Sequence, residues 1–292
     1  AKHKEAANIE KDCMKDTMNK DKHFPFQDTM SMRGSAGKVI ILLNGKKFGD
    51  REVPVGYYHL HQNAIYHQQK LVYEVESLVK TRTGAMANLK ESNDGNKATR
   101  PIVRVVLTKP LAPGVKHGVI ELYRTITGYY KGDYNQPKET WEMHEGSGEE
   151  DWINFTWTST HMAYKIELPP EFIVNDLKEK EDPGIHTITH VFANAAKIVT
   201  KCEAVDIEAH YHSGSIYLYD NTNEGVNGVT QMIHEKYDRI LETSKELLKN
   251  CECDKGEKPE LGGCPKCTFT TGFCQTNNRE LDKKKAREFF GA

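Results

Sequence analysis

Between residue 36 and about residue 170, the chain is dominated by short segments in which β-branched and aromatic residues alternate with polar ones. Alternation with a period of two is typical of strands that bury one face. Asn44-Gly45, which follows the first of these segments, is a typical hairpin turn. The pattern predicts a β-rich domain over residues 31–175, folded as a small barrel or a curled sheet. The predicted strands lie in KVIILL, VPVGYYHLH, AIYHQQKLVYEVESLV, IVRVVLTK, HGVIELYRTITGYYKG and INFTWTSTHMAYKIEL.

The pattern changes after Pro169-Pro170, and apolar residues then recur at the spacing of helices. One such helix is predicted over about His186–Lys201, and a longer one from near Val226 to Cys251. Two strand-like segments, AVDIEAHYH and SIYLYD, lie between them. These patterns predict an α+β domain over residues 176–292, and they place the whole chain in the α+β class.

The two ends of the chain carry more charge than the rest. Residues 1–30 are charged and only lightly apolar, which indicates a separate N-terminal arm. A last charged helix is predicted over Arg279–Phe290. The chain begins with Ala1 rather than Met, as expected of a processed chain or of a piece of a longer protein.

Composition narrows the class of protein. Hydrophobic residues make up 37% of the 292 residues and charged residues 28%, which is typical of a globular protein. No apolar stretch approaches the roughly 20 residues that a membrane-spanning helix needs. The first 25 residues contain many Lys, Glu and Asp, unlike a secretory signal. We therefore expect a cytoplasmic protein with no membrane partner.

Charge is distributed unevenly although the net charge is only −2. The segment Lys80–Lys131 contains ten basic and three acidic residues, whereas Glu139–Asp182 contains twelve acidic and three basic ones. The basic segment is either a solvated surface or a surface that contacts the phosphates of DNA. Rings next to cations can also stack bases. The candidate DNA contacts are Arg100, Arg104, Arg124, Tyr129, Tyr130 and Lys131.

Five of the seven cysteines lie within 24 residues, in the arrangement C-x-C, ten residues, C-P-x-C, with Cys274 beyond it. Two close pairs can supply the four thiolates of a tetrahedral Zn²⁺ site, and the Gly- and Pro-containing loop between them can bring the pairs together. We predict a structural zinc ion, because all four positions are filled by protein. The predicted ligands are Cys251, Cys253, Cys264 and Cys267. Cys274 is a reserve ligand, and a redox or disulfide role is the alternative.

A second kind of metal site is a weaker alternative. His186-x-x-x-His190 places two imidazoles on one helix face, but the Glu that a zinc protease needs between them is missing. Glu208, His210 and His212 lie at alternate positions of one predicted strand and form a weak metalloenzyme pattern. The sequence contains neither G-x-x-x-x-G-K-[ST] nor G-x-S-x-G, so we predict no catalytic residue and leave open whether the chain is part of an enzyme.

Several segments, taken in order, resemble the C-terminal region of MrfA-like superfamily-two DNA helicases. The resemblance rests on the C-x-C pair, the knuckle Gly263-Cys264-Pro265-Lys266-Cys267, and the final Leu281-Asp282-Lys283 with Ala286. IYLYDNTNEGVNG, GIHTITH, TITGYYK, LHQNAIYHQQKLVYEVESL and SMRGS resemble family segments in the same order. The similarity covers roughly residues 30–292. The cysteine loop is longer than in the family, and Asn223-Glu224-Gly225 replaces the usual Pro-Gly-Gly turn.

The resemblance implies a module without a motor, because the two ATPase domains of such helicases are missing from this sequence. The expected function is a DNA-binding zinc module for DNA repair or defence, which guides single-stranded or forked DNA and orders the ATPase domains. Those domains would be partners in the same chain or, as in relatives of the DISARM type, in a separate chain. The alternative is a structural subunit that docks a helicase partner and never touches DNA.

Overall fold

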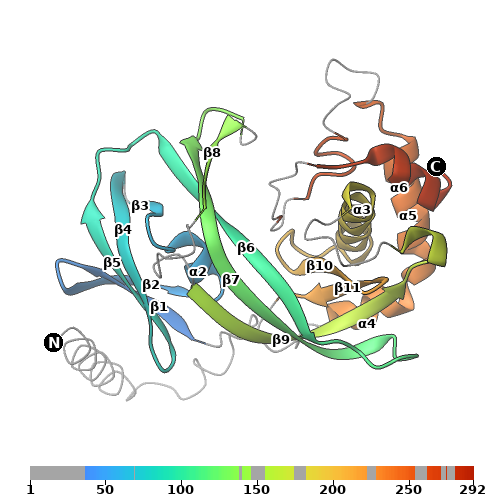
Figure 1. Cartoon of the computed structure of the whole chain (residues 1–292), viewed down its shortest axis with the longest axis horizontal. Helices are drawn as coiled ribbons and strands as arrows, with labels where there is room; N and C mark the ends of the chain where they lie inside the picture. The colour runs from blue at the N-terminus through green and yellow to red at the C-terminus, as the bar shows by residue number, and fades with distance from the viewer. Residues whose placement is uncertain are drawn as a thin grey trace. The chain divides into compact units, whose positions relative to one another are not determined.

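The computed structural model describes residues 37–68, 70–137, 140–145, 155–173, 182–221, 228–253, 262–270, 274 and 280–292. The arm predicted over residues 1–30 lies outside these ranges. The described part combines curled sheets with a C-terminal group of helices (Figure 1), and the predicted α+β class is confirmed. None of the helices in these ranges is long and apolar enough to cross a membrane.

The first sheet has five strands in the order β2-β1-β5-β4-β3. β1 and β5 are parallel, and the other neighbours are antiparallel. Asn44 and Gly45 connect β1 to β2 with φ values of 52° and 73°, as the predicted turn requires. The strands are β1 (Lys38–Leu43), β2 (Lys46–Glu52), β3 (Ile65–Gln68), β4 (Leu71–Lys80) and β5 (Gly84–Glu91).

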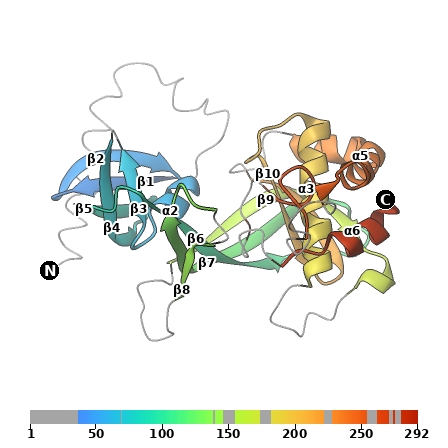
Figure 2. The same cartoon turned by 90° about the horizontal axis from the view of Figure 1, so that it is seen from above.

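One predicted strand is a helix instead. The segment VPVGYYHLH contains α2 (Val55–His59), which lies beside the strands of the first sheet (Figure 2). Tyr57 of this helix is buried in the same core cluster as Val39 of β1. Gly56 allows this close packing, because a Cβ at Gly56 would lie 2.6 Å from Cγ2 of Val39. The prediction was wrong because so short an apolar segment fits the buried face of a single helical turn as well as a strand.

The second sheet has the order β10-β11-β9-β7-β6, and β8 pairs with β7. All these pairs are antiparallel. Val103, Ile126 and Trp157 of this sheet are buried in the same core cluster as side chains of the first sheet. The strands are β6 (Lys97–Lys109), β7 (His117–Asp133), β8 (Glu142–Glu145), β9 (Phe155–Glu167), β10 (Ile207–His212) and β11 (Ser215–Asp220).

This second sheet continues across residue 175. β9 precedes that residue and β11 follows it, yet Ile166 and Ile216 are partners in register. A short 3₁₀ helix, η2 (Pro170–Phe172), follows β9. The β-rich part and the α+β part that the sequence predicts therefore share one sheet, and the division at residue 175 stays a prediction.

Helix α3 (Pro183–Thr200) lies at the centre of the C-terminal core, with β10, α5 (Tyr237–Lys249) and α6 (Lys283–Phe290) packed around it (Figures 1 and 2). The carboxylate of Asp182 accepts hydrogen bonds from the N–H groups of Gly184 and Ile185 at 2.9 and 3.0 Å. Pro183 occupies the first helical position, where no N–H is needed. The helix therefore begins three residues before the predicted start.

The long helix predicted to end at Cys251 is interrupted at Lys236, where α4 (Val229–Glu235) gives way to α5. The rings of His234 and Tyr237, on either side of the interruption, both pack on Tyr164 of β9, with centroid distances of 5.4 and 5.5 Å. The predicted start at Val226 lies outside the described residues.

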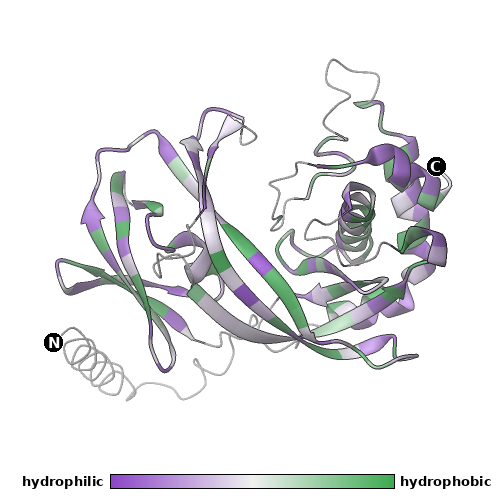
Figure 3. Ribbon diagram, viewed as in Figure 1, coloured by the Kyte–Doolittle hydropathy of each residue, from purple (hydrophilic) through white to green (hydrophobic). Residues whose placement is uncertain are grey.

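The last helix, α6, begins at Lys283 rather than Arg279, and Asp282 caps it by accepting a hydrogen bond from the N–H of Lys285 at 3.0 Å. Most of α6 is hydrophilic (Figure 3), although Ala286 is fully buried against the C-terminal core. The helix thus presents one short apolar face to α3.

Arg124 of β7 is a buried cation, with 1% of its surface exposed. Its guanidinium donates hydrogen bonds to Oγ of Ser159 and, at 3.2 Å, to the hydroxyl of Tyr219, and it lies 3.8 Å from the carboxylate of Glu208. The Tyr219 hydroxyl donates to that same carboxylate at 2.8 Å. Burial opposes the charge, but Tyr219, Tyr58 and Glu208 together hold the pKa of Arg124 above its ordinary value. This network joins four strands of the second sheet.

We predict that Arg124→Met destabilises the fold by about 3–5 kcal/mol, because it leaves the Glu208 carboxylate buried without its cation. Arg104→Met is the matched control, since Arg104 is exposed on the adjacent strand, and a surface change of this kind costs about 0.5 kcal/mol or less. Denaturant unfolding measures both. Equal stability of the two variants would contradict a structural role for Arg124.

Candidate metal centre

The four predicted zinc ligands come together although they arise from two separate segments. Cys251 and Cys253 follow the end of α5, and Cys264 and Cys267 lie in the segment 262–270. Their sulfur atoms all lie within 4.8 Å of one another. The Sγ–Sγ distances are 3.5 Å for Cys251–Cys264, 3.7 Å for Cys253–Cys267 and 3.8 Å for Cys264–Cys267. Four sulfurs placed about 2.3 Å from a tetrahedral zinc are about 3.8 Å apart, so the spacing fits the ion.

A tight turn holds the second cysteine pair. The carbonyl of Cys264 accepts hydrogen bonds from the N–H groups of Cys267 and Thr268, both at 3.1 Å, and the N–H of Lys266 points at Sγ of Cys264 at 3.4 Å. Gly263 has a φ of 146°, and a Cβ there would collide with Oγ1 of Thr268. The Gly-Cys-Pro-x-Cys sequence therefore folds into a knuckle that aims both sulfurs and one N–H at the same point.

Lys283 of α6 supplies a positive charge beside the sulfurs. It is 5% exposed, and its ammonium donates hydrogen bonds to Sγ of Cys253 at 3.2 Å and to the carbonyl of Cys251 at 2.9 Å. A zinc ion with four thiolates carries a net charge of −2, and the ammonium offsets part of it. The sequence prediction did not include Lys283, although the Leu-Asp-Lys at the start of the last helix was a signal.

The thiols of the cluster differ in acidity. Burial raises the pKa of Cys267 to about 12. Burial also raises the pKa of Cys251. Hydrogen bonds from the Cys253 N–H and from neighbouring thiols outweigh this effect and lower that pKa to about 7. Four thiolates this close require a cation between them, which is the chemistry that Zn²⁺ supplies.

Helix α3 supports the knuckle through its polar side chains. Nδ1 of His190 donates to the carbonyl of Thr268 at 3.0 Å. The side-chain amide of Asn194 donates to the carbonyls of Cys267 and Phe269 at 3.3 and 3.0 Å. The knuckle is therefore attached to the most deeply buried helix of the C-terminal core.

The reserve ligand, Cys274, lies elsewhere. Its Sγ is 3.4 Å from Nε2 of His186, and it forms a second buried group with His186 and His190. Burial raises the pKa of the Cys274 thiol, but hydrogen bonds with the two imidazoles outweigh this effect and lower the pKa to about 4. No such ligand group among the described residues contains Glu208, His210 or His212. The carboxylate of Glu208 instead binds Tyr219, near Arg124.

The six predicted DNA contacts do not share one exposed surface. Arg124 lies inside the second sheet, and Tyr129 and Tyr130 are 8% and 5% exposed. Arg100 is half-buried, and Lys131 forms a 2.7 Å ion pair with Asp94, whereas Arg104 is exposed. The prediction is corrected for Arg124, Tyr129 and Tyr130, because their side chains are buried by protein. Tyr129 and Tyr130 are consecutive, so protein covers both faces of β7 at this point.

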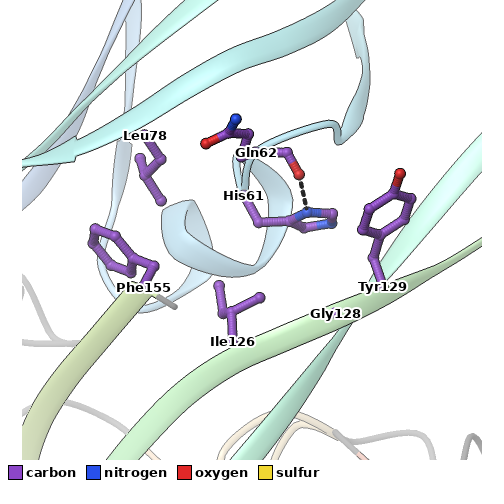
Figure 4. Close-up of a pocket in the computed structure, with 7 residues that line it drawn as sticks. All are labelled: His61, Gln62, Leu78, Ile126, Gly128, Tyr129 and Phe155. Carbon is purple, nitrogen blue, oxygen red and sulfur yellow. Dashed lines mark hydrogen bonds between the residues drawn. The ribbon is translucent and has the colours of Figure 1, made fainter. Parts of the chain in front are cut away.

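Figure 4 shows the surroundings of Tyr129. Its ring packs on His61 with a centroid distance of 5.4 Å, beside an enclosed cavity of about 10 Å³ that is also lined by Ile126 and Phe155. The ring also stacks on His144, with a centroid distance of 4.9 Å. Tyr129 is therefore packed against two histidine rings and is only 8% exposed, which leaves little of the ring open to a base.

Two comparisons of sequence find similar proteins. The family model described as the MrfA Zn-binding domain matches residues 188–268. Protein MJ1572.1 of Methanocaldococcus jannaschii is 30% identical over 112 residues, which cover 35% of this chain and 92% of that protein. The resemblance that the sequence predicts is confirmed by the first of these matches.

One solved structure has the same fold. The crystal structure of DUF1998 helicase MrfA bound to DNA matches with a TM-score of 0.50 and 18% identity, over 93% of this chain and 36% of that chain. A crystal structure of DUF1998 helicase MrfA matches with a TM-score of 0.46 and 17% identity, over 79% of this chain and 32% of that chain. This chain thus spans about a third of the length of these helicases. At 18% identity, the first match shows a shared fold and nothing about function.

The segment that the family model matches contains the cysteine cluster. Residues 188–268 include all four clustered cysteines and most of α3. The chain belongs to one family with protein MJ1572.1, and it contains an MrfA Zn-binding domain whose four-cysteine cluster fits a structural zinc ion.

Proposed function

We propose that this chain is the non-motor zinc module of an MrfA-like DNA helicase. The observation that carries the proposal is the match of the MrfA Zn-binding domain to the segment in which the four cysteines converge. The sequence contains no phosphate-binding loop of the G-x-x-x-x-G-K-[ST] type. ATP hydrolysis is therefore the task of motor domains, either in the same chain or in a partner, and this module guides a DNA strand and orders those domains.

The zinc ion has a structural part in this proposal. It joins the end of α5 to the knuckle, and Lys283 joins Cys251 and Cys253 to the start of α6. A zinc site built from reduced cysteines is typical of a reducing compartment, so the proposal includes the cytoplasm as the place where the module works.

The best candidate for a DNA-contacting surface is a cavity of about 490 Å³ where β5 begins. Lys80 and Arg82 line it and are both exposed, and they belong to the basic segment that the sequence singles out. Tyr57 and Trp157 also line it, but they are only 6% and 7% exposed, so the two cations are the groups open to a ligand. Two exposed cations beside a concave surface fit the phosphates of a single strand. Arg104 is exposed as well and remains part of the proposal.

We predict that Cys264→Ser removes one zinc ion and loosens the C-terminal end, because a structural zinc site contributes on the order of 10 kcal/mol to local folding. Amide hydrogen exchange should become faster in α5 and α6 and stay unchanged in β1 to β5, with zinc content measured in parallel. Cys202→Ser is the matched control, since Cys202 is half-buried and belongs to neither ligand group. Unaltered exchange in α6 after zinc loss would refute the structural role.

We predict that the full chain binds single-stranded DNA and that the double variant Lys80→Gln/Arg82→Gln binds it more weakly. Each lost phosphate contact should reduce the log–log salt slope by about 0.7, so two contacts reduce it by about 1.4. Fluorescence anisotropy over a salt series measures both quantities.

Lys109→Gln/Lys116→Gln is the control for this experiment, because it removes the same charge from exposed positions at the connection between β6 and β7. Its slope should match that of the native chain. If the native chain binds the helicase motor but no DNA at low salt, the docking alternative replaces the DNA-guiding function.

A further inference from the structure

Three buried side chains with metal-binding chemistry meet next to the four-cysteine cluster. His186 and His190 come from α3 and Cys274 from a segment more than 80 residues later, and their exposed fractions are 6%, 6% and 5%. One ligand atom from each lies within 4.8 Å of the other two. We call this group the three-ligand cluster. None of its members belongs to the four-cysteine cluster.

The distances fit a zinc ion. Sγ of Cys274 lies 3.4 Å from Nε2 of His186, and a tetrahedral zinc bound by one sulfur and one imidazole nitrogen sets that separation at about 3.6 Å. The rings of His186 and His190 are 4.3 Å apart at an interplanar angle of 74°. A separation of four residues places both rings on the same face of α3.

The hydrogen bond of His190 prepares it as a ligand. Its Nδ1 lies 3.0 Å from the carbonyl of Thr268. A carbonyl only accepts, so Nδ1 carries the proton and the lone pair stays on Nε2. Histidines that bind metal ions usually donate their other ring N–H in this way, which fixes the tautomer and the ring orientation.

The thiolate of a cysteine and the unprotonated nitrogen of an imidazole are both ligands that zinc prefers. Three protein ligands leave one position of a zinc tetrahedron for a water molecule.

We propose that His186, His190 and Cys274 bind a second zinc ion, which fastens the chain beyond the knuckle to helix α3. Thr268 links the two sites, because it follows the ligand Cys267 and its carbonyl is held by the ligand His190. The second site goes beyond the proposed function, and it does not depend on whether the module binds DNA.

The test is the zinc content of the full chain, purified from zinc-supplemented medium and freed of excess metal by gel filtration. We expect two zinc ions per chain in the native protein and in the Cys202→Ser control, and one in Cys274→Ser. Cys264→Ser should also retain one. One zinc ion per native chain, unchanged by Cys274→Ser, would overturn the proposal and leave a thiol–imidazole hydrogen bond.

A ligand exchange covers the case in which Cys274→Ser fails to fold. His186→Cys keeps a metal-binding atom at the same place on α3, so we expect it to retain two ions. After cobalt substitution, the thiolate-to-metal charge-transfer absorption per chain should rise from that of five thiolates to that of six, by about one fifth. A single bound ion in His186→Cys, with absorption of four thiolates, would equally overturn the second site.

Discussion

The C-terminal end of this chain depends on four converging sulfurs, which bind a cation when they are thiolates. Three of the Sγ–Sγ distances lie between 3.5 and 3.8 Å, and thiolates at this range repel one another strongly where protein replaces water. A central Zn²⁺ converts the repulsion into four bonds, and Lys283 then balances part of the remaining negative charge. The start of α6 is therefore specified by the charge of the metal site as much as by the apolar contact of Ala286 with the core.

Helix α3 connects this electrostatic site to the rest of the fold. The helix contacts β10 and β11, and its Ile188 and Val191 are fully buried in the C-terminal core cluster, which also contains side chains of both strands. His190 and Asn194 of the same helix donate hydrogen bonds to backbone carbonyls of the knuckle. Because β11 pairs with β9, the metal site rests on the same sheet that carries Trp157 on the wall of the basic cavity. A rigid, buried helix between sheet and metal is suited to a module that has to keep two surfaces in a fixed relation.

The sequence predicted those features that depend on local chemistry. Two close cysteine pairs separated by a Gly- and Pro-containing loop predicted the convergence of Cys251 and Cys264, because thiolate pairs at that spacing have few other uses. The alternation of apolar and polar residues predicted most strands, because a strand that buries one face requires this spacing. The partnership of Cys274 with His186 was not predictable, since 88 residues separate them and nothing in either segment encodes the contact. Lys283 was missed because a lysine at a helix start is ordinarily a solvated residue.

Arg124 shows that the number of charged residues in a strand segment does not predict the charge of the protein surface. The basic segment Lys80–Lys131 lies largely on strands, and in a paired strand alternate side chains point into the protein whatever their charge. Arg124 has an inward position and is neutralised by Glu208, so it adds nothing to the outer potential. Lys80 and Arg82 lie where β4 turns into β5, and the protein does not enclose them. A turn leaves its cations solvated and able to displace the counterions that condense on DNA, which is the physical origin of affinity for phosphate. In the proposed function, the connection between β4 and β5 is therefore the part of the basic segment that contacts a DNA strand, and the strands position it.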